Sequence, residues 1–353
     1  MFKLRSLQKS YEVGIASSRS LHVSYFAFKG HVTKGMENEN QTMIIEFLFT
    51  AFPHFQDGGC PFFILLLFIY LFIIIGNSMV FVAVVLDVRL HTPMYFFIGV
   101  LAFLEIWYTT TTIPKMLINL VSDQKTISIA GCLLQMYFFH SIGITEAYLL
   151  TTMAIDRYLA ICYPLRYPTI MTPQLYTSLT LGCCFFGFLT PLPEITWIAT
   201  LPFCGPNQIH NIFCDFDPIL NLACVDTSSI ILIKVVDIIH AMEIISAITL
   251  VILAYIQIIG VILRIRSSEG RHKAFSTCAS HLAIFLIFFG SVALMYLRFN
   301  AKYSFIWDTT ISLMFAVLSP FFNPIIYSLR NKEIKGAIKK YLCQLKIFTC
   351  YST

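Results

Sequence analysis

Residues 58–86 read GGCPFFILLLFIYLFIIIGNSMVFVAVVL and contain no charged side chain. A helix needs about 20 consecutive, mostly apolar residues to cross the roughly 30 Å hydrocarbon core of a bilayer, and this run is long enough. Six further segments share its length and apolar character: 92–114, 126–155, 167–193, 235–263, 274–297 and 309–329. The sequence therefore predicts an all-α membrane protein, a bundle of seven transmembrane helices.

The composition excludes several other classes of protein. Only 12% of the 353 residues are charged and 57% are hydrophobic, whereas soluble globular domains carry about 25% charged residues. A transmembrane barrel would show alternating polarity over segments of about ten residues, which these continuous runs do not. We find no phosphate-binding glycine loop, His-Glu-x-x-His motif, nucleophile elbow or Cys-x-x-Cys pair, so we expect no enzyme activity.

The distribution of Lys and Arg predicts the orientation of the bundle. Thirteen of these residues lie in the first, third and fifth loops and the C-terminal tail. Only five lie in the other loops, namely Lys115, Lys125, Lys234, Arg298 and Lys302. Because cytoplasmic loops are enriched in basic residues, the N-terminus is expected outside and the C-terminus in the cytoplasm.

The segments outside the seven spans have distinct expected roles. Residues 1–35 hold six basic residues and only Glu12 as an acid, which indicates a disordered N-terminal extension rather than a nucleic-acid surface. Residues 36–58 would form the extracellular N-terminus, with a glycosylation sequon at Asn40. The seven-helix domain is expected over 59–330, and residues 331–353 as a cytoplasmic tail with a short amphipathic helix on the bilayer surface.

Four cysteines fall on the predicted outer side, where disulfides persist. They are Cys132, Cys204, Cys214 and Cys224. Four cysteines allow three pairings, and their spacing alone does not choose among them.

Short motifs at the cytoplasmic ends of two spans indicate a family. The third span ends in Asp156-Arg157-Tyr158, and the seventh contains Asn323-Pro324-Ile325-Ile326-Tyr327. Three longer runs accompany them: LHTPMYFF (90–97), KAFSTCASH (273–281) and PFFNPIIYSLRN (320–331). Together they resemble a rhodopsin-like G-protein-coupled receptor of the olfactory (odorant) class, over roughly residues 36–345.

The resemblance implies a mechanism and a set of residues. A small hydrophobic or volatile odorant would bind within the bundle, and a stimulatory (olfactory) heterotrimeric G protein would raise cyclic AMP. The receptor would lie in the plasma membrane, in the sensory cilia of olfactory neurons. The switch residues would be Asp156, Arg157, Tyr158, Tyr255, Asn323, Pro324 and Tyr327, and the disulfides would be Cys132–Cys214 and Cys204–Cys224. The alternative is a rhodopsin-like receptor for an endogenous lipid or metabolite outside the nose.

The expected odorant pocket lies between the outer halves of the third, fifth and sixth spans. By resemblance its lining residues are Phe139, His140, Gly143, Ile144, Ile239, Glu243, Val292 and Tyr296. Two of them have a plainer interpretation. His140 is either a pocket residue or a hydrogen-bonded core histidine, and Glu243 is either a polar anchor or one half of a mutually satisfied pair with His240.

Glu105 and Glu146 lie in the middle of the second and third spans, where charged groups are costly. The resemblance suggests that this acidic pair, near Asn77 and Asn323, holds a sodium ion, and hard oxygen ligands suit a hard cation. In the alternative interpretation one acid is protonated and the two share a proton. Otherwise no cofactor is expected.

The chain departs from the usual family pattern at four places. Ile155 precedes Asp156 where the family has Tyr, Phe289 stands where it has the Tyr of Phe-Tyr-Gly, Ala254 replaces Ser before Tyr255, and Glu105 replaces Asp. These differences concern the details of switching rather than the class of protein.

Overall fold

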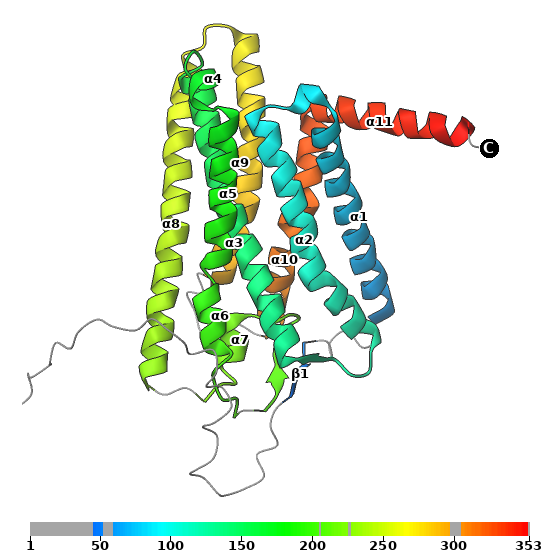
Figure 1. Cartoon of the computed structure of the whole chain (residues 1–353), viewed down its shortest axis with the longest axis vertical. Coiled ribbons are helices and arrows are strands. Elements are labelled where there is room, and N and C mark those ends of the chain that lie inside the picture. Colours follow the sequence, from blue (N-terminus) through cyan, green and yellow to red (C-terminus); the bar gives the residue numbers. More distant parts are fainter. Residues whose placement is uncertain (1–44, 52–58, 205, 225–226, 297–304, 352–353) are drawn as a thin grey trace, which may run out of the picture. The chain divides into compact units, whose positions relative to one another are not determined.

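The computed structural model describes residues 45–51, 59–204, 206–224, 227–296 and 305–351. Within them, seven long helices run side by side (Figure 1). They are α1 (Gly59–Leu86), α2 (Pro93–Val121), α3 (Ile129–Cys162), α5 (Pro173–Leu189), α8 (Thr227–Leu263), α9 (Ser268–Tyr296) and α10 (Phe305–Arg330). The predicted seven-helix bundle is confirmed.

The helices differ in how apolar they are. Five stretches are long and apolar enough to cross a membrane: Cys60–Leu86, Pro93–Val121, Pro173–Ile198, Ile231–Leu263 and Thr310–Tyr327. In α9 the apolar part is shorter, Cys278–Leu294. The more polar α3 packs against α2, α5, α8 and α9, so protein rather than lipid surrounds much of it. The protein is thus a multi-pass membrane protein.

Several helices begin or end away from the predicted boundaries. The predicted span 167–193 is interrupted, because Tyr167–Ile170 form a separate turn, α4, before α5 begins at Pro173. A residue that precedes proline is disfavoured in the helical region, and Thr172 is extended and accepts a hydrogen bond from the Leu175 amide. After α5, the short helix α6 (Leu192–Ile198) completes the apolar stretch.

A small sheet, which the sequence did not predict, ties three separate segments together. Strand β1 (Glu46–Phe49) lies between β2 (Thr126–Ser128), to which it is antiparallel, and β3 (Gln208–Ile209), to which it is parallel. The Leu48 amide donates to the Asn207 carbonyl over 2.7 Å. Phe47 and Phe49 on β1 are buried, so this segment belongs to the folded core.

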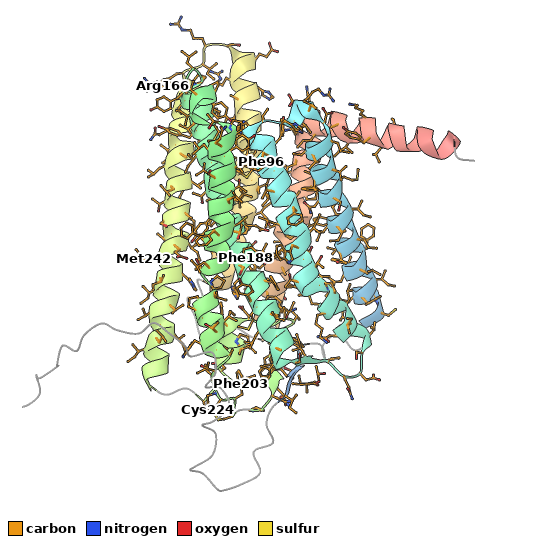
Figure 2. All side chains as sticks on the ribbon, in the orientation of Figure 1. Phe96, Arg166, Phe188, Phe203, Cys224 and Met242 are labelled. Atoms are coloured by element: carbon orange, nitrogen blue, oxygen red, sulfur yellow. A yellow bond between two sulfur atoms is a disulfide. The ribbon has the colours of Figure 1, made fainter. Side chains whose placement is uncertain are left out.

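The two ends of the bundle carry different features. One end, which we call the disulfide end, carries the sheet and the paired cysteines, and Figure 2 labels Cys224 and Phe203 there. The opposite end, the Arg157 end, includes Arg166 and the turn η2 (Val88–Leu90). Here α11 (Lys332–Tyr351) leaves α10 and runs away from the bundle (Figure 1). It is longer than the short helix that the tail sequence indicated.

Some predicted features lie outside the described residues. These are the extension 1–35, the sequon at Asn40 and the side chain of Tyr296. The orientation of the bundle across a membrane stays a prediction.

Candidate ligand and coupling sites

At the disulfide end, a short segment of the loop between α6 and α8 lies across α3. We call residues 213–216 the strap. The structure has the disulfides Cys132–Cys214 and Cys204–Cys224, with Cα–Cα distances of 5.5 and 5.6 Å, which is the pairing that the resemblance implies. The Gln135 side chain accepts from the Cys214 amide over 3.0 Å and donates to the Thr111 carbonyl over 3.0 Å, so it joins the strap, α3 and α2.

A second contact holds the strap about one and a half turns beyond Gln135 on α3. His140 Nε2 lies 3.0 Å from Asp215 Oδ1, and the two side chains are only 10% and 7% exposed. The His140 ring stacks on Phe216, with centroids 4.1 Å apart. Asp215 Oδ1 also accepts from the Phe216 amide over 2.9 Å and so begins α7 (Phe216–Leu220). His140 therefore has a partner within the protein, as in its plainer interpretation.

Phe139, beside His140, is enclosed by aromatic rings from other segments. Its ring centroid lies 4.9 Å from that of Tyr108 on α2, 4.8 Å from Phe213 on the strap and 5.6 Å from Phe315 on α10. This aromatic cluster closes the space between α2, α3 and α10 beneath the strap.

The other expected ligand residues have varied surroundings. Gly143 and Ile144 are half-buried on α3, Val292 is buried on α9, and Glu243 is half-buried on α8 near Tyr148. Ile239 is 52% exposed, within the membrane-length apolar stretch Ile231–Leu263 of α8. Their contact with a ligand stays a prediction.

The acidic pair lies in the middle of the bundle and interacts directly across α2 and α3. Glu105 Oε1 accepts from the Asn323 amide and, over 3.1 Å, from the Ser319 hydroxyl. Asn77 donates instead to the Pro320 carbonyl over 3.1 Å and joins α1 to α10. Within the described chain, three buried oxygens of the cluster have no hydrogen-bond partner: Glu105 Oε2, Glu146 Oε1 and Asn323 Oδ1. These are hard donors of the kind that a small cation prefers.

At the Arg157 end, Asp156 is fully buried and has two partners. Arg157 Nε lies 3.7 Å from Asp156 Oδ2, and the Tyr167 hydroxyl of α4 donates to Asp156 Oδ1 over 2.8 Å. Burial and the Asp156 carboxylate both raise the pKa of the Tyr167 phenol, so Tyr167 stays a donor at neutral pH. Tyr158 lies beside the pair, and its hydroxyl contacts that of Tyr163.

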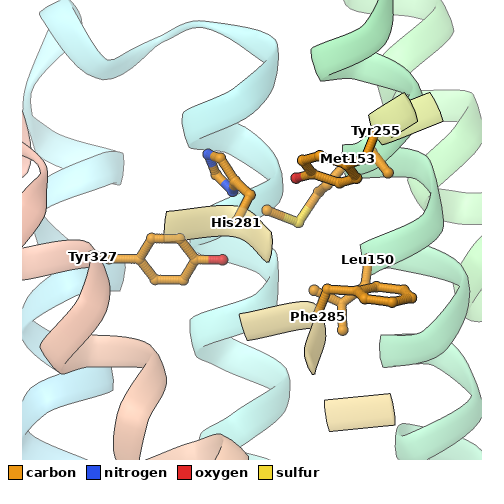
Figure 3. Close-up of a pocket in the computed structure, with 7 residues that line it drawn as sticks. Leu150, Met153, Tyr255, His281, Phe285 and Tyr327 are labelled. Atoms are coloured by element: carbon orange, nitrogen blue, oxygen red, sulfur yellow. The ribbon is translucent and has the colours of Figure 1, made fainter. Parts of the chain in front are cut away.

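Next to this pair, a small cavity separates four helices (Figure 3). Its volume is about 10 Å³, roughly the space that one water molecule requires. It is lined by Leu150, Met153 and Ala154 of α3, Tyr255 of α8, His281 and Phe285 of α9, and Tyr327 of α10. Tyr327 points into it in Figure 3, and its buried hydroxyl has no hydrogen-bond partner among the described residues.

The switch residues Asp156, Arg157, Tyr255 and Tyr327 thus meet at one end of the bundle, with Asn323 and Pro324 linking them to the acidic pair. Sequence reasoning did not assign roles to four residues that the structure adds: Gln135, Asp215, Tyr167 and His281. Two of the four had a signal in the sequence. Asp215 directly follows a cysteine, and His281 ends the motif KAFSTCASH.

Comparison with known proteins agrees with this arrangement. A family model described as "Olfactory receptor" matches residues 66–345. The chain belongs to the olfactory receptor family. Olfactory receptor 6K6 of Homo sapiens is 61% identical over 330 residues, covering 94% of this chain and 95% of that protein. Olfactory receptor 6K2 of Homo sapiens is 63% identical over 313 residues, covering 89% and 96%.

Membership of the olfactory receptor family has two consequences. The receptor is a G-protein-coupled receptor and not an enzyme. Chemistry on a substrate is therefore not the role of either end of the bundle.

Proposed function

We propose that this olfactory receptor binds a small hydrophobic odorant within its helix bundle and activates a stimulatory G protein, which raises cyclic AMP. The proposal includes the plasma membrane, in sensory cilia, as its location, with the disulfide end outside and Asn40 glycosylated. The strap and the aromatic cluster around Phe139 support a ligand site near the disulfide end, because odorant-sized sites are mostly apolar with few polar groups.

The observation that carries the proposal is the arrangement around Arg157. Its guanidinium group is held by the buried Asp156, whose other oxygen is held by Tyr167. Beside it, the hydroxyls of Tyr255 and Tyr327 approach a cavity rather than a packed core. Helix ends that pack around a cavity can adopt two alternative arrangements. A ligand shifts the equilibrium between the two arrangements by binding one of them better.

The acidic pair adds a cation to the proposal. Glu105 and Glu146, with Asn323 and Ser319, would hold a sodium ion through their oxygen atoms. Two buried carboxylates in direct contact repel each other, so a cation between them would stabilise the ionised form. The ion would then favour the arrangement of α2, α3 and α10 seen in the structure, and Glu105→Gln should abolish any sodium dependence of the receptor's thermal stability.

The experiment is cyclic AMP accumulation in cells that display the receptor, measured against a broad odorant panel. Arg157→Ala is compared with Lys339→Ala, an exposed basic residue on α11 at the same end. We expect a ligand-dependent rise in the parent and in Lys339→Ala, and none in Arg157→Ala displayed at the same level. An undiminished response in Arg157→Ala would contradict the proposal. A response to lipids or metabolites alone would favour the alternative receptor outside the nose.

A further inference from the structure

Beyond Glu105, the inner face of α2 carries two polar side chains that neither the acidic pair nor the switch uses. Glu105, Thr112 and Asn119 follow one another at intervals of seven residues, so they share one face of the helix. All three are 0% exposed. Glu105 has partners on α10, but within the described residues Thr112 Oγ1 and both side-chain atoms of Asn119 have no hydrogen-bond partner.

The neighbouring threonines show that this is specific to Thr112. In the run Thr109–Thr112, the first three hydroxyls donate to carbonyls one turn earlier on α2. Thr109 donates to Glu105 over 2.8 Å, Thr110 to Ile106 over 2.6 Å and Thr111 to Trp107 over 3.0 Å. Thr112 makes no such bond, although the same local partner is the ordinary solution for a threonine within a helix.

Asn119 is the more demanding residue. A buried amide normally satisfies its donor and its acceptor, because leaving either unpaired in an apolar environment is costly. One turn before Asn119 on the same face of α2 lie the half-buried Lys115 and the buried Met116. A buried amide with both functions unused calls for a partner that the described residues do not supply.

We propose that Asn119 and Thr112 form a polar subsite for ligands along α2, distinct from the expected ligand residues on α3, α8 and α9. Asn119 would bind a group that both donates and accepts, such as a hydroxyl or a carboxylic acid. Seven residues of helix span about 10 Å, so Thr112 would bind a second oxygen of the same elongated ligand. One turn from Thr112, on the side away from Asn119, Tyr108 belongs to the aromatic cluster with Phe139 and Phe315.

The ligand class that follows is an aliphatic chain of about eight carbons with hydrogen-bonding oxygens at both ends, since an extended chain of that length matches the rise of two helical turns.

The backbone of α2 between Thr112 and Asn119 is also interrupted, so this part of the helix can adjust to a ligand. Pro114 lies between the two residues and has no N–H, so the Thr110 carbonyl loses its partner within the helix. Gln135 of α3 takes the next carbonyl, that of Thr111.

The test uses the full-length receptor in nanodiscs and three probes of equal chain length: 1,8-octanediol, 1-octanol and 1,8-dimethoxyoctane. The diether keeps both oxygens of the diol and loses both donors. We expect the diol to raise the midpoint of thermal unfolding at a concentration at least tenfold below that of the diether, with 1-octanol between them. Equal effects of the diol and the diether, or no effect of the diol, would overturn the proposal.

Three variants assign the effect to α2. Asn119→Leu should remove the preference for the diol, and Thr112→Val should reduce the diol to the level of 1-octanol. Thr110→Val is the matched control, because Thr110 is exposed and its hydroxyl is already bonded. Both inner variants remove unpaired polar atoms, so they should fold at least as well as the parent. A preference that survives in Asn119→Leu would show that the residue is merely structural and would overturn the proposal.

This inference rests on the proposed receptor function, yet the two fail differently. Thermal unfolding reports binding alone, whereas cyclic AMP reports coupling. A shift of the unfolding midpoint that is specific to the diol, with no cyclic AMP response to the diol or to the odorant panel, would contradict the proposed function and leave the subsite standing. A cyclic AMP response to the odorant panel, with no preference for the diol over the diether, would do the reverse.

Discussion

The two ends of the bundle are held by different kinds of interaction. At the disulfide end, two disulfides, the three-stranded sheet and the pair His140–Asp215 fix the strap to α3. At the Arg157 end, the described residues include no disulfide. Non-covalent contacts hold this end beside a cavity, among them the pair Asp156–Arg157, the Tyr167 hydroxyl and the hydrogen bond from Tyr95 to Glu333. The difference indicates that the first end is built to keep a shape and the second to change it.

The largest effect should come from the covalent link between the strap and α3. The Cys132–Cys214 disulfide joins residues 82 positions apart, and chain entropy predicts a stabilisation of about 4 to 5 kcal/mol for a loop of that size. The double variant Cys132→Ala/Cys214→Ala should therefore lose most of its surface display, measured by flow cytometry on a tagged receptor.

The second disulfide is the matched control for the first. Cys204–Cys224 closes a separation of only 20 residues, for which the same model gives about 3 kcal/mol. Its removal should reduce display less. Equal display of both double variants would show that the strap needs no covalent link to α3.

A substitution in the middle of the bundle, between the two ends, should destabilise the whole protein. A Cβ atom on Gly187 of α5 would overlap the Thr145 hydroxyl and lie 2.9 Å from the Thr145 Cα on α3. Because the backbone cannot yield as a side chain does, Gly187→Ala should lower the free energy of unfolding by about 3 kcal/mol. Gly182→Ala on the same helix has nothing within 4 Å of its added Cβ, so it should leave the midpoint of thermal unfolding unchanged or slightly higher. Similar unfolding of the two variants would contradict this packing.

The seven helices could be predicted because long apolar runs have only one stable arrangement in a bilayer. The switch residues could be predicted from short motifs, since Asp156-Arg157-Tyr158 and Asn323-Pro324 are local in sequence. The contacts that distinguish the two ends could not be predicted from the sequence. His140 and Asp215 are 75 positions apart, and neither the spacing nor the residue types specify that the strap crosses α3 at that turn. Likewise β1 is four residues long, too short for an alternating pattern to indicate a strand.

Two smaller changes test the ends against each other, beginning with the strap. Asp215→Ala leaves His140 buried without its partner, which should cost about 2 kcal/mol of stability. We expect a lower midpoint of thermal unfolding and no rise in ligand-free cyclic AMP. A rise would show that the strap, too, takes part in switching.

At the Arg157 end, the comparable change should have the opposite signature. Tyr167→Phe removes one hydrogen bond to the Asp156 carboxylate, about 1.5 kcal/mol, and so favours release of Arg157 about tenfold. Ligand-free cyclic AMP should rise, and the midpoint of thermal unfolding should fall less than in Asp215→Ala. Adding Arg157→Ala should abolish the rise. Unchanged cyclic AMP in Tyr167→Phe would show that Tyr167 does not restrain the switch.

The most direct test of the difference between the ends is hydrogen–deuterium exchange of the parent and Tyr167→Phe, without ligand. We predict faster exchange in Tyr167→Phe at the Arg157 end, in residues 154–162 and 268–281, and unchanged exchange at the disulfide end, in residues 126–135 and 208–216. Equal acceleration at both ends, or acceleration only at the disulfide end, would contradict the conclusion that one end is fixed and the other moves.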